Sequence, residues 1–164
     1  MPEIKYCPQC REKLVLKMID AKKRMVCPSE ACGYVFWDSP ITVAAALVEY
    51  EGKIVLARNK DWPEKWFGLI TGFLEKGETI EDGTLREVKE ELGLDGEVAR
   101  FIGIYPFFER NQLIIAYHVK AEGKVVLGEE LVEVKHVVPE KLKPWPMGTG
   151  HAVRDWLQPR GISA

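Results

Sequence analysis

Residues 72–94 read GFLEKGETIEDGTLREVKEELGL, a short loop that leads into a strongly acidic segment. Thr79 followed by Asp82 is typical of a helix N-terminus, and Gly93 is a natural place for a helix to end. Three apolar residues recur between these points at helical spacing: Leu85, Val88 and Leu92. The segment therefore predicts a loop followed by an amphipathic helix of about four turns with one buried stripe.

Glutamates crowd another side of this predicted helix. Glu87 and Glu91 are four residues apart and share a face, and Glu90 lies one turn from Glu87. Like charges at this spacing destabilise a helix by a few tenths of a kcal/mol per pair. A divalent cation would turn that repulsion into attraction, and carboxylate oxygens suit Mg²⁺ or Mn²⁺. The competing interpretation is a solvated helix face with no ligand.

The same segment resembles the Nudix signature, G-x5-E-x7-R-E-U-x-E-E-x-G-U, in which U is a bulky aliphatic residue. Every fixed position matches: Gly72, Glu78, Arg86, Glu87, Val88, Glu90, Glu91, Gly93 and Leu94. The resemblance covers roughly residues 40–157. It implies hydrolysis of a pyrophosphate bond in a nucleoside diphosphate derivative, such as NADH, ADP-ribose or FAD, by attack of water on phosphorus with a catalytic Mg²⁺ or Mn²⁺ ion.

The resemblance also assigns roles to individual residues. It makes Glu87, Glu90 and Glu91 ligands of the divalent metal, with the carbonyl of Gly72 as a further ligand. It pairs Glu78 with Arg86, which orients the glutamates.

The family often draws its general base from a loop outside the signature, and the matching stretch here is Gly128–Glu133. Glu130 is the preferred base, with Glu129 and Glu133 as alternatives. An edge strand that carries acids for solubility is the competing interpretation.

All four cysteines lie in the first 32 residues: Cys7, Cys10, Cys27 and Cys32. Two close pairs separated by a hairpin-sized insert suit one tetrahedral ion, and thiolates favour zinc, with iron as the main competitor. Disulfides are disfavoured in a reducing compartment. A closed four-sulfur site is structural, and the segment resembles a zinc ribbon. Its insert predicts two strands, near residues 14–16 and 25–26, joined by a polar turn over residues 20–24.

The rest of the chain alternates between predicted strands and loops. Strands are expected over residues 41–48, 53–57, 69–71, 98–105, 113–119 and 132–138, and a final helix is expected over residues 149–157. Up to Trp37 the chain carries seven Lys/Arg against four Asp/Glu, whereas the remainder of the chain is acidic. We therefore expect an α+β fold, an α/β/α sandwich of the Nudix type with a mixed sheet (residues 39–164), preceded by a small zinc-ribbon module (residues 1–38).

Composition limits the classes of partner. The chain has 164 residues, 46% hydrophobic and 29% charged, with a net charge of −2, which predicts a soluble domain without a global basic field. No apolar run could span a bilayer and the N-terminus lacks a signal-peptide pattern, so we expect a cytoplasmic protein that binds a small-molecule nucleotide. Capped RNA has no support in the sequence, and the oligomeric state, a homodimer included, stays open.

A zinc ribbon before a Nudix domain resembles the NADH pyrophosphatase branch, yet residues 104–112 depart from that branch's S-Q-P-W-P-F-P-x-S array. The broader substrate class is therefore expected. The alternative is a non-catalytic nucleotide- or nucleic-acid-binding sensor, with Lys22–Arg24 contacting phosphates.

Weaker candidates complete the set. His118 is expected to be structural, whereas His151 either contacts phosphate or caps the last helix. Tyr105, Phe107 and Phe108 either stack on a base or pack in the core.

Overall fold

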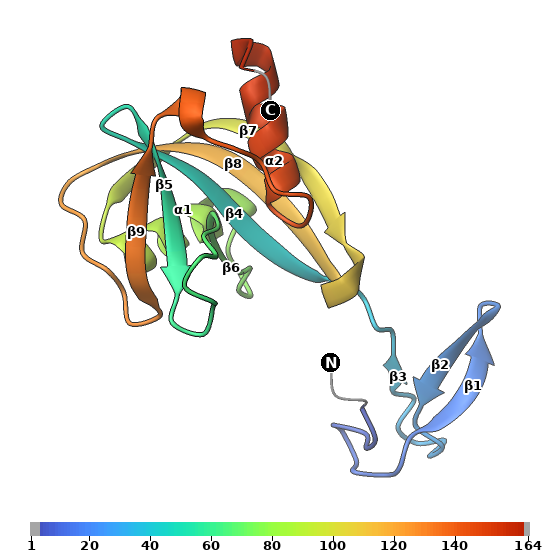
Figure 1. Ribbon diagram of the computed structural model, residues 1–164. Helices are drawn as coiled ribbons and strands as arrows, with labels where there is room; N and C mark the ends of the chain where they lie inside the picture. The colour runs from blue at the N-terminus through green and yellow to red at the C-terminus, as the bar shows by residue number, and fades with distance from the viewer. Residues whose placement is uncertain (1–3, 163–164) are drawn as a thin grey trace. The chain divides into compact units, whose positions relative to one another are not determined.

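The computed structural model describes residues 4–162, and the chain divides into two compact units, Met1–Pro40 and Ile41–Ala164 (Figure 1). Each unit has its own sheet and its own buried cluster. In the described part of the chain, no helix is both long and apolar enough to cross a membrane.

The first unit is a three-stranded antiparallel sheet of β1 (Val15–Ile19), β2 (Lys22–Val26) and β3 (Val35–Phe36). The turn between β1 and β2 is shorter than we expected from the sequence. Asp20 and Ala21 both adopt positive φ, so the chain reverses within two residues and residues 22–24 belong to β2. Arg24, one of the basic residues there, donates to the carbonyl of Trp37 at 2.5 Å within the same unit.

The second unit contains the predicted strands and both predicted helices. Its main elements are β4 (Ile41–Tyr50), β5 (Lys53–Asn59), β6 (Ile70–Phe73), α1 (Ile80–Leu92), β7 (Asp95–Phe107), β8 (Gln112–Glu122), β9 (Leu131–Val137) and α2 (Gly150–Leu157). Three short 3₁₀ helices cover residues 108–110, 139–141 and 158–160. β7 is longer than predicted because it pairs with β8 along nearly its whole length, from Asp95 opposite Glu122 to Phe107 opposite Gln112.

The six strands form one mixed sheet. The order is β7-β8-β4-β5-β9, and β6 pairs with β4 on the side away from β8. β4 and β8 run parallel, whereas the other described pairs are antiparallel. The expected mixed-sheet fold is confirmed.

β4 supplies core residues to both faces of the sheet. Ala45 and Leu47 belong to the cluster that contains Trp156 of α2, whereas Ala46 and Val48 belong to the cluster that packs against α1. Side chains alternate between the faces of a strand, so one apolar strand serves both helices. In Figure 1, α1 lies behind the sheet and α2 in front of it. The unit is therefore an α/β/α sandwich.

His118 is buried and lies within hydrogen-bond distance of a carboxylate, as expected of a structural residue. Its Nε2 lies 2.8 Å from Glu49 Oε2, and its ring meets the Trp156 ring edge-on. Burial lowers the pKa of His118 although Glu49 opposes that shift.

The other aromatic candidates divide between core and surface. Tyr105 is buried and donates to Asp155 at 2.9 Å, and His151 stacks against its ring. Phe107 packs against the same core, whereas Phe108 is exposed.

Candidate functional site

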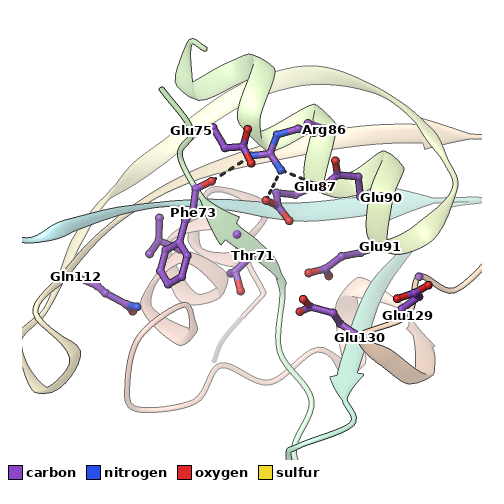
Figure 2. Close-up of a pocket in the computed structure, with 13 residues that line it drawn as sticks. Thr71, Phe73, Glu75, Arg86, Glu87, Glu90, Glu91, Gln112, Glu129 and Glu130 are labelled. Atoms are coloured by element: carbon purple, nitrogen blue, oxygen red, sulfur yellow. Dashed lines mark hydrogen bonds and ion pairs between the residues drawn. The ribbon is translucent and has the colours of Figure 1, made fainter. Parts of the chain in front are cut away.

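An acidic cleft of about 580 Å³ lies where α1, β6 and the loop before β9 meet (Figure 2). Its lining residues are Val43, Thr71, Gly72, Phe73, Glu75, Arg86, Glu87, Glu90, Glu91, Gln112, Gly128, Glu129 and Glu130. Six of these are glutamates and one is an arginine. The cleft therefore brings together the residues expected to bind a divalent metal and the preferred general base, although they come from three separate segments.

Helix α1 begins and ends where its sequence predicts. The Thr79 hydroxyl oxygen accepts from the N–H of Asp82 at 3.1 Å, and Gly93 ends the helix in the left-handed conformation. Lys89 pairs with Asp95 at 2.7 Å and is not among the residues that line the cleft. The helix thus buries its apolar stripe and presents its carboxylates to the cleft.

The guanidinium of Arg86 uses all five of its N–H donors. It donates two hydrogen bonds to Glu78, at 3.0 and 2.8 Å, one to Glu87 at 2.6 Å and one to Glu90 at 3.0 Å. The fifth bond reaches the carbonyl of Phe73 at 3.1 Å. Figure 2 shows the contacts of Arg86 with Glu87, Glu90 and the carbonyl of Phe73 at the top of the cleft.

Glu78 is the anchor of this network and lies outside the lining of the cleft. Hydrogen bonds from Arg86, with a further one from the N–H of Glu75 at 2.6 Å, lower the pKa of Glu78 to about 2. The predicted pairing of Glu78 with Arg86, and the orientation of Glu87 by Arg86, are both present in the structure.

Gly72 lies against the carboxylate of Glu87. Gly72 pairs with Ala44 in the sheet, and a Cβ atom at position 72 would overlap that carboxylate. The glycine is therefore required for space, since its φ is not positive. This contact puts the Gly72 backbone beside the carboxylates, where its carbonyl was predicted to bind a metal.

The carboxylates below Arg86 carry more negative charge than the arginine balances. Burial, together with repulsion from Glu87, Glu130 and Glu90, raises the pKa of Glu91 to about 8. Burial also raises the pKa of Glu87 despite its bond to Arg86. A divalent cation would offset this charge with the hard oxygen ligands that such ions prefer.

The loop before β9 separates the three candidates for the general base. Glu130 lines the cleft, and Figure 2 shows its carboxylate close to that of Glu91. Glu129, one residue earlier in the loop, also lines the cleft. Glu133 does not line it, and pairs instead with Arg58 on β5 at 3.2 Å. The structure therefore does not bring Glu133 into the site.

Five lining residues were missed by sequence reasoning: Val43, Thr71, Phe73, Glu75 and Gln112. Phe73 is 57% exposed in the structure. The only signal in the sequence was its position directly after the first glycine of the signature. Gln112 has no local signal, because parallel pairing opposite Ile41 brings it to the cleft.

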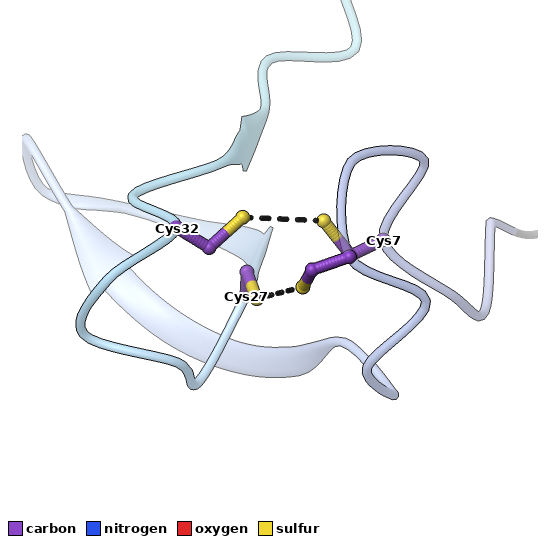
Figure 3. Close-up of side chains that lie close together, drawn as sticks. Cys7, Cys27 and Cys32 are labelled. Atoms are coloured by element: carbon purple, nitrogen blue, oxygen red, sulfur yellow. Dashed lines mark hydrogen bonds between the residues drawn. The ribbon is translucent and has the colours of Figure 1, made fainter.

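The four cysteines form a second candidate site, in the N-terminal unit. Their sulfur atoms all lie within 4.8 Å of one another, with Cys7–Cys32 at 3.6 Å and Cys10–Cys27 at 3.4 Å (Figure 3). A tetrahedron with metal–sulfur bonds of about 2.3 Å has edges of about 3.8 Å. Within residues 4–162 these cysteines are the one group whose ligand atoms already lie close enough to hold a single ion.

The sandwich and its carboxylate-bearing helix have the architecture of a Nudix domain. A family model described as NUDIX domain matches residues 38–155, and the chain belongs to this family. The resemblance seen in the signature is thereby confirmed.

Curated relatives match parts of the chain. The NAD-capped RNA hydrolase NudC of Mycobacterium bovis is 39% identical over 66 residues, which are 40% of this chain and 21% of that protein. The ADP-ribose pyrophosphatase of Methanocaldococcus jannaschii is 34% identical over 100 residues, which are 60% of this chain and 53% of that protein. The chain therefore spans about a fifth of the length of the first relative and about half that of the second.

A solved structure matches nearly the whole chain. The NUDIX hydrolase from Nitrosomonas europaea has a TM-score of 0.79 and 22% sequence identity, covering 98% of this chain and 96% of that one. At 22% sequence identity, the match shows that the two chains share a fold.

The raised pKa of Glu91 predicts a pH-dependent stability. A carboxyl whose folded pKa exceeds its ordinary 4.5 stabilises the fold fully at low pH, and this contribution is lost as the pH rises through about 8. In metal-free protein, Glu91→Gln should therefore gain stability over wild type as the pH rises from about 5 to 9, by up to about 5 kcal/mol. Urea unfolding of both proteins with a chelator measures the difference, and a gap that does not change with pH would contradict the prediction.

Proposed function

We propose that this chain hydrolyses a pyrophosphate bond in a nucleoside diphosphate derivative, with Mg²⁺ or Mn²⁺ bound in the acidic cleft. One observation carries the proposal: carboxylates from α1 and the loop before β9 converge on one cleft and repel one another there, as the raised pKa of Glu91 indicates. Such a cleft repels an anionic substrate unless cations accompany it. Family membership supports the same reaction.

The residues of α1 would hold the metal. Glu87, Glu90 and Glu91, with the carbonyl of Gly72, offer hard oxygen ligands, and Arg86 with Glu78 keeps two of these carboxylates in place. When bound, the ion supplies positive charge that draws the phosphate oxygens to the carboxylates. The protein orients the carboxylates in advance: Arg86 already holds them in place before the substrate binds, so binding does not have to restrict their side chains.

Glu130 would act as the general base. The carboxylate is in the cleft near Glu91 but is anchored on a different segment, so it can accept a proton from the attacking water while α1 holds the metal. A base of this kind must reach the water directly or through one further water.

The substrate class proposed is broad and includes NADH, ADP-ribose and FAD. The names of two relatives, an NAD-capped RNA hydrolase and an ADP-ribose pyrophosphatase, support derivatives with an adenosine diphosphate core. Phe73 offers an exposed ring in the cleft for a base to stack on.

A hydrolysis screen tests the proposed function. Wild-type protein with Mg²⁺ or Mn²⁺ should release a mononucleotide from at least one of NADH, ADP-ribose, FAD or NAD-capped RNA, and a chelator should abolish the reaction. Glu91→Gln should fold but lose about 10²-fold or more of the activity, because the ion loses an anionic ligand. Binding of these compounds without hydrolysis would instead support the nucleotide sensor.

Neighbouring glutamates give a matched test of the general base. Glu130→Gln should lower kcat by about 10²–10⁴-fold with little change in KM, and higher pH should partly restore the rate as hydroxide replaces the missing acceptor. Glu129→Gln should be nearly silent if the exposed side chain of Glu129 points to solvent. A pH–rate profile at saturating Mg²⁺ distinguishes them, and the reverse pattern would move the assignment to Glu129.

We also propose that Cys7, Cys10, Cys27 and Cys32 bind one structural zinc ion. The N–H groups of Cys10 and Gln9 outweigh the effect of burial and lower the pKa of Cys7 to about 7, whereas burial raises that of Cys27 to about 12. Four thiolates this close together need a cation. The boundary proposed near residue 38 would let the ribbon and the Nudix domain fold separately.

Loss of one cysteine should affect one unit only. Cys27→Ser removes a zinc ligand, so amides of residues 4–40 should lose hydrogen-exchange protection while those of the second unit, which has no cysteine, keep it. Elemental analysis should find about one zinc per wild-type chain and less in the variant. Collapse of protection along the whole chain would contradict separate folding.

A further inference from the structure

The ladder between β5 and β9 contains an irregularity beside the cleft. Arg58 pairs with Glu133, but the next residue, Asn59, pairs with Leu131, so Val132 is an extra residue in β9. A β-bulge of this kind bends its strand and redirects the side chains next to it. Here it lies directly after Glu130, on the segment that leads from the cleft into the sheet.

The amide of Asn59 is oriented by its own turn. Its Oδ1 accepts from the N–H of Asp61 at 3.0 Å, and its main-chain carbonyl accepts from the N–H of Trp62 at 3.0 Å. Because Oδ1 is used in this way, the NH₂ group must face the other side. A flipped amide would place two donors against each other.

That NH₂ group faces the carboxylate of Glu130. Asn59 Nδ2 lies 3.4 Å from Glu130 Oε2, and the N–H of Lys60 donates to the main-chain carbonyl of Glu130 at 2.9 Å. One short segment therefore holds Glu130 through both its backbone and its side chain. The contact with Oε2 leaves the second oxygen of the carboxylate able to accept a proton.

We propose that Asn59 is a positioning residue that acts through Glu130: it restrains the carboxylate in the cleft with one oxygen directed at the attacking water. This inference rests on the proposed function, in which Glu130 is the general base. A carboxylate on an exposed loop would otherwise sample several rotamers, few of which point into the cleft.

The test is a double-mutant cycle on the full chain, using the best substrate of the screen at saturating Mg²⁺. Asn59→Leu removes the hydrogen bond with little change in size and should lower kcat by about tenfold with KM nearly unchanged. In a Glu130→Gln background the same change should cost nothing further, because the residue it acts through is gone. Asn59→Asp keeps the acceptor for Asp61 while losing the donor, and should also lower kcat if the turn is intact.

Glu133→Gln is the matched control, because it breaks the ion pair to Arg58 on the other side of the bulge and should leave kcat unchanged. Equal losses from Asn59→Leu in both backgrounds, or no loss in the wild-type background, would overturn the role of Asn59 while Glu130 stays the base. A silent Glu130→Gln variant would overturn the base assignment and this inference with it.

Discussion

The guanidinium of Arg86 is the interaction on which the rest of the site depends. Its five donors reach Glu78, Glu87, Glu90 and the carbonyl of Phe73, so one planar group ties helix α1 to strand β6 and to the loop between them. Only arginine presents donors in such a fixed fork, and lysine could not replace it. The arrangement compensates part of the negative charge and leaves the rest for an added cation. Arg86 thus both orients the glutamates and determines how much of their negative charge remains unbalanced in the cleft.

The packing of α1 and β6 in the sandwich positions the residues that Arg86 contacts. Helix α1 buries Val88 and Leu92 against one face of the sheet, which turns its acidic side toward the cleft. The close approach of Gly72 to Glu87 then sets how near β6 can lie to the helix. Packing energy therefore supports an arrangement of mutually repelling carboxylates that is unfavourable by itself, as is common where function opposes stability.

The sequence predicted those features that depend on local spacing. The helix with its Thr79 cap, the signature residues of the cleft and the two cysteine pairs are all set by residues that are neighbours in the chain. Sequence reasoning missed what depends on strand pairing. Gln112 reaches the cleft because β8 runs parallel to β4. The bulge next to the contact between Asn59 and Glu130 is visible only in the register of β5 and β9. Neither pairing leaves a local pattern in the sequence.

Strand β4 is buried on both faces, so the burial of its side chains specifies its pairing register only weakly. Both of its faces are apolar, so a slip by one residue would exchange two hydrophobic surfaces and burial would oppose it only weakly. Glu49 makes the two registers unequal. In the native pairing it reaches His118 on the α2 side, whereas a slipped strand would carry its carboxylate to the opposite face, away from this partner. A single polar pair at the end of an apolar strand thus favours the native alignment of the central strand.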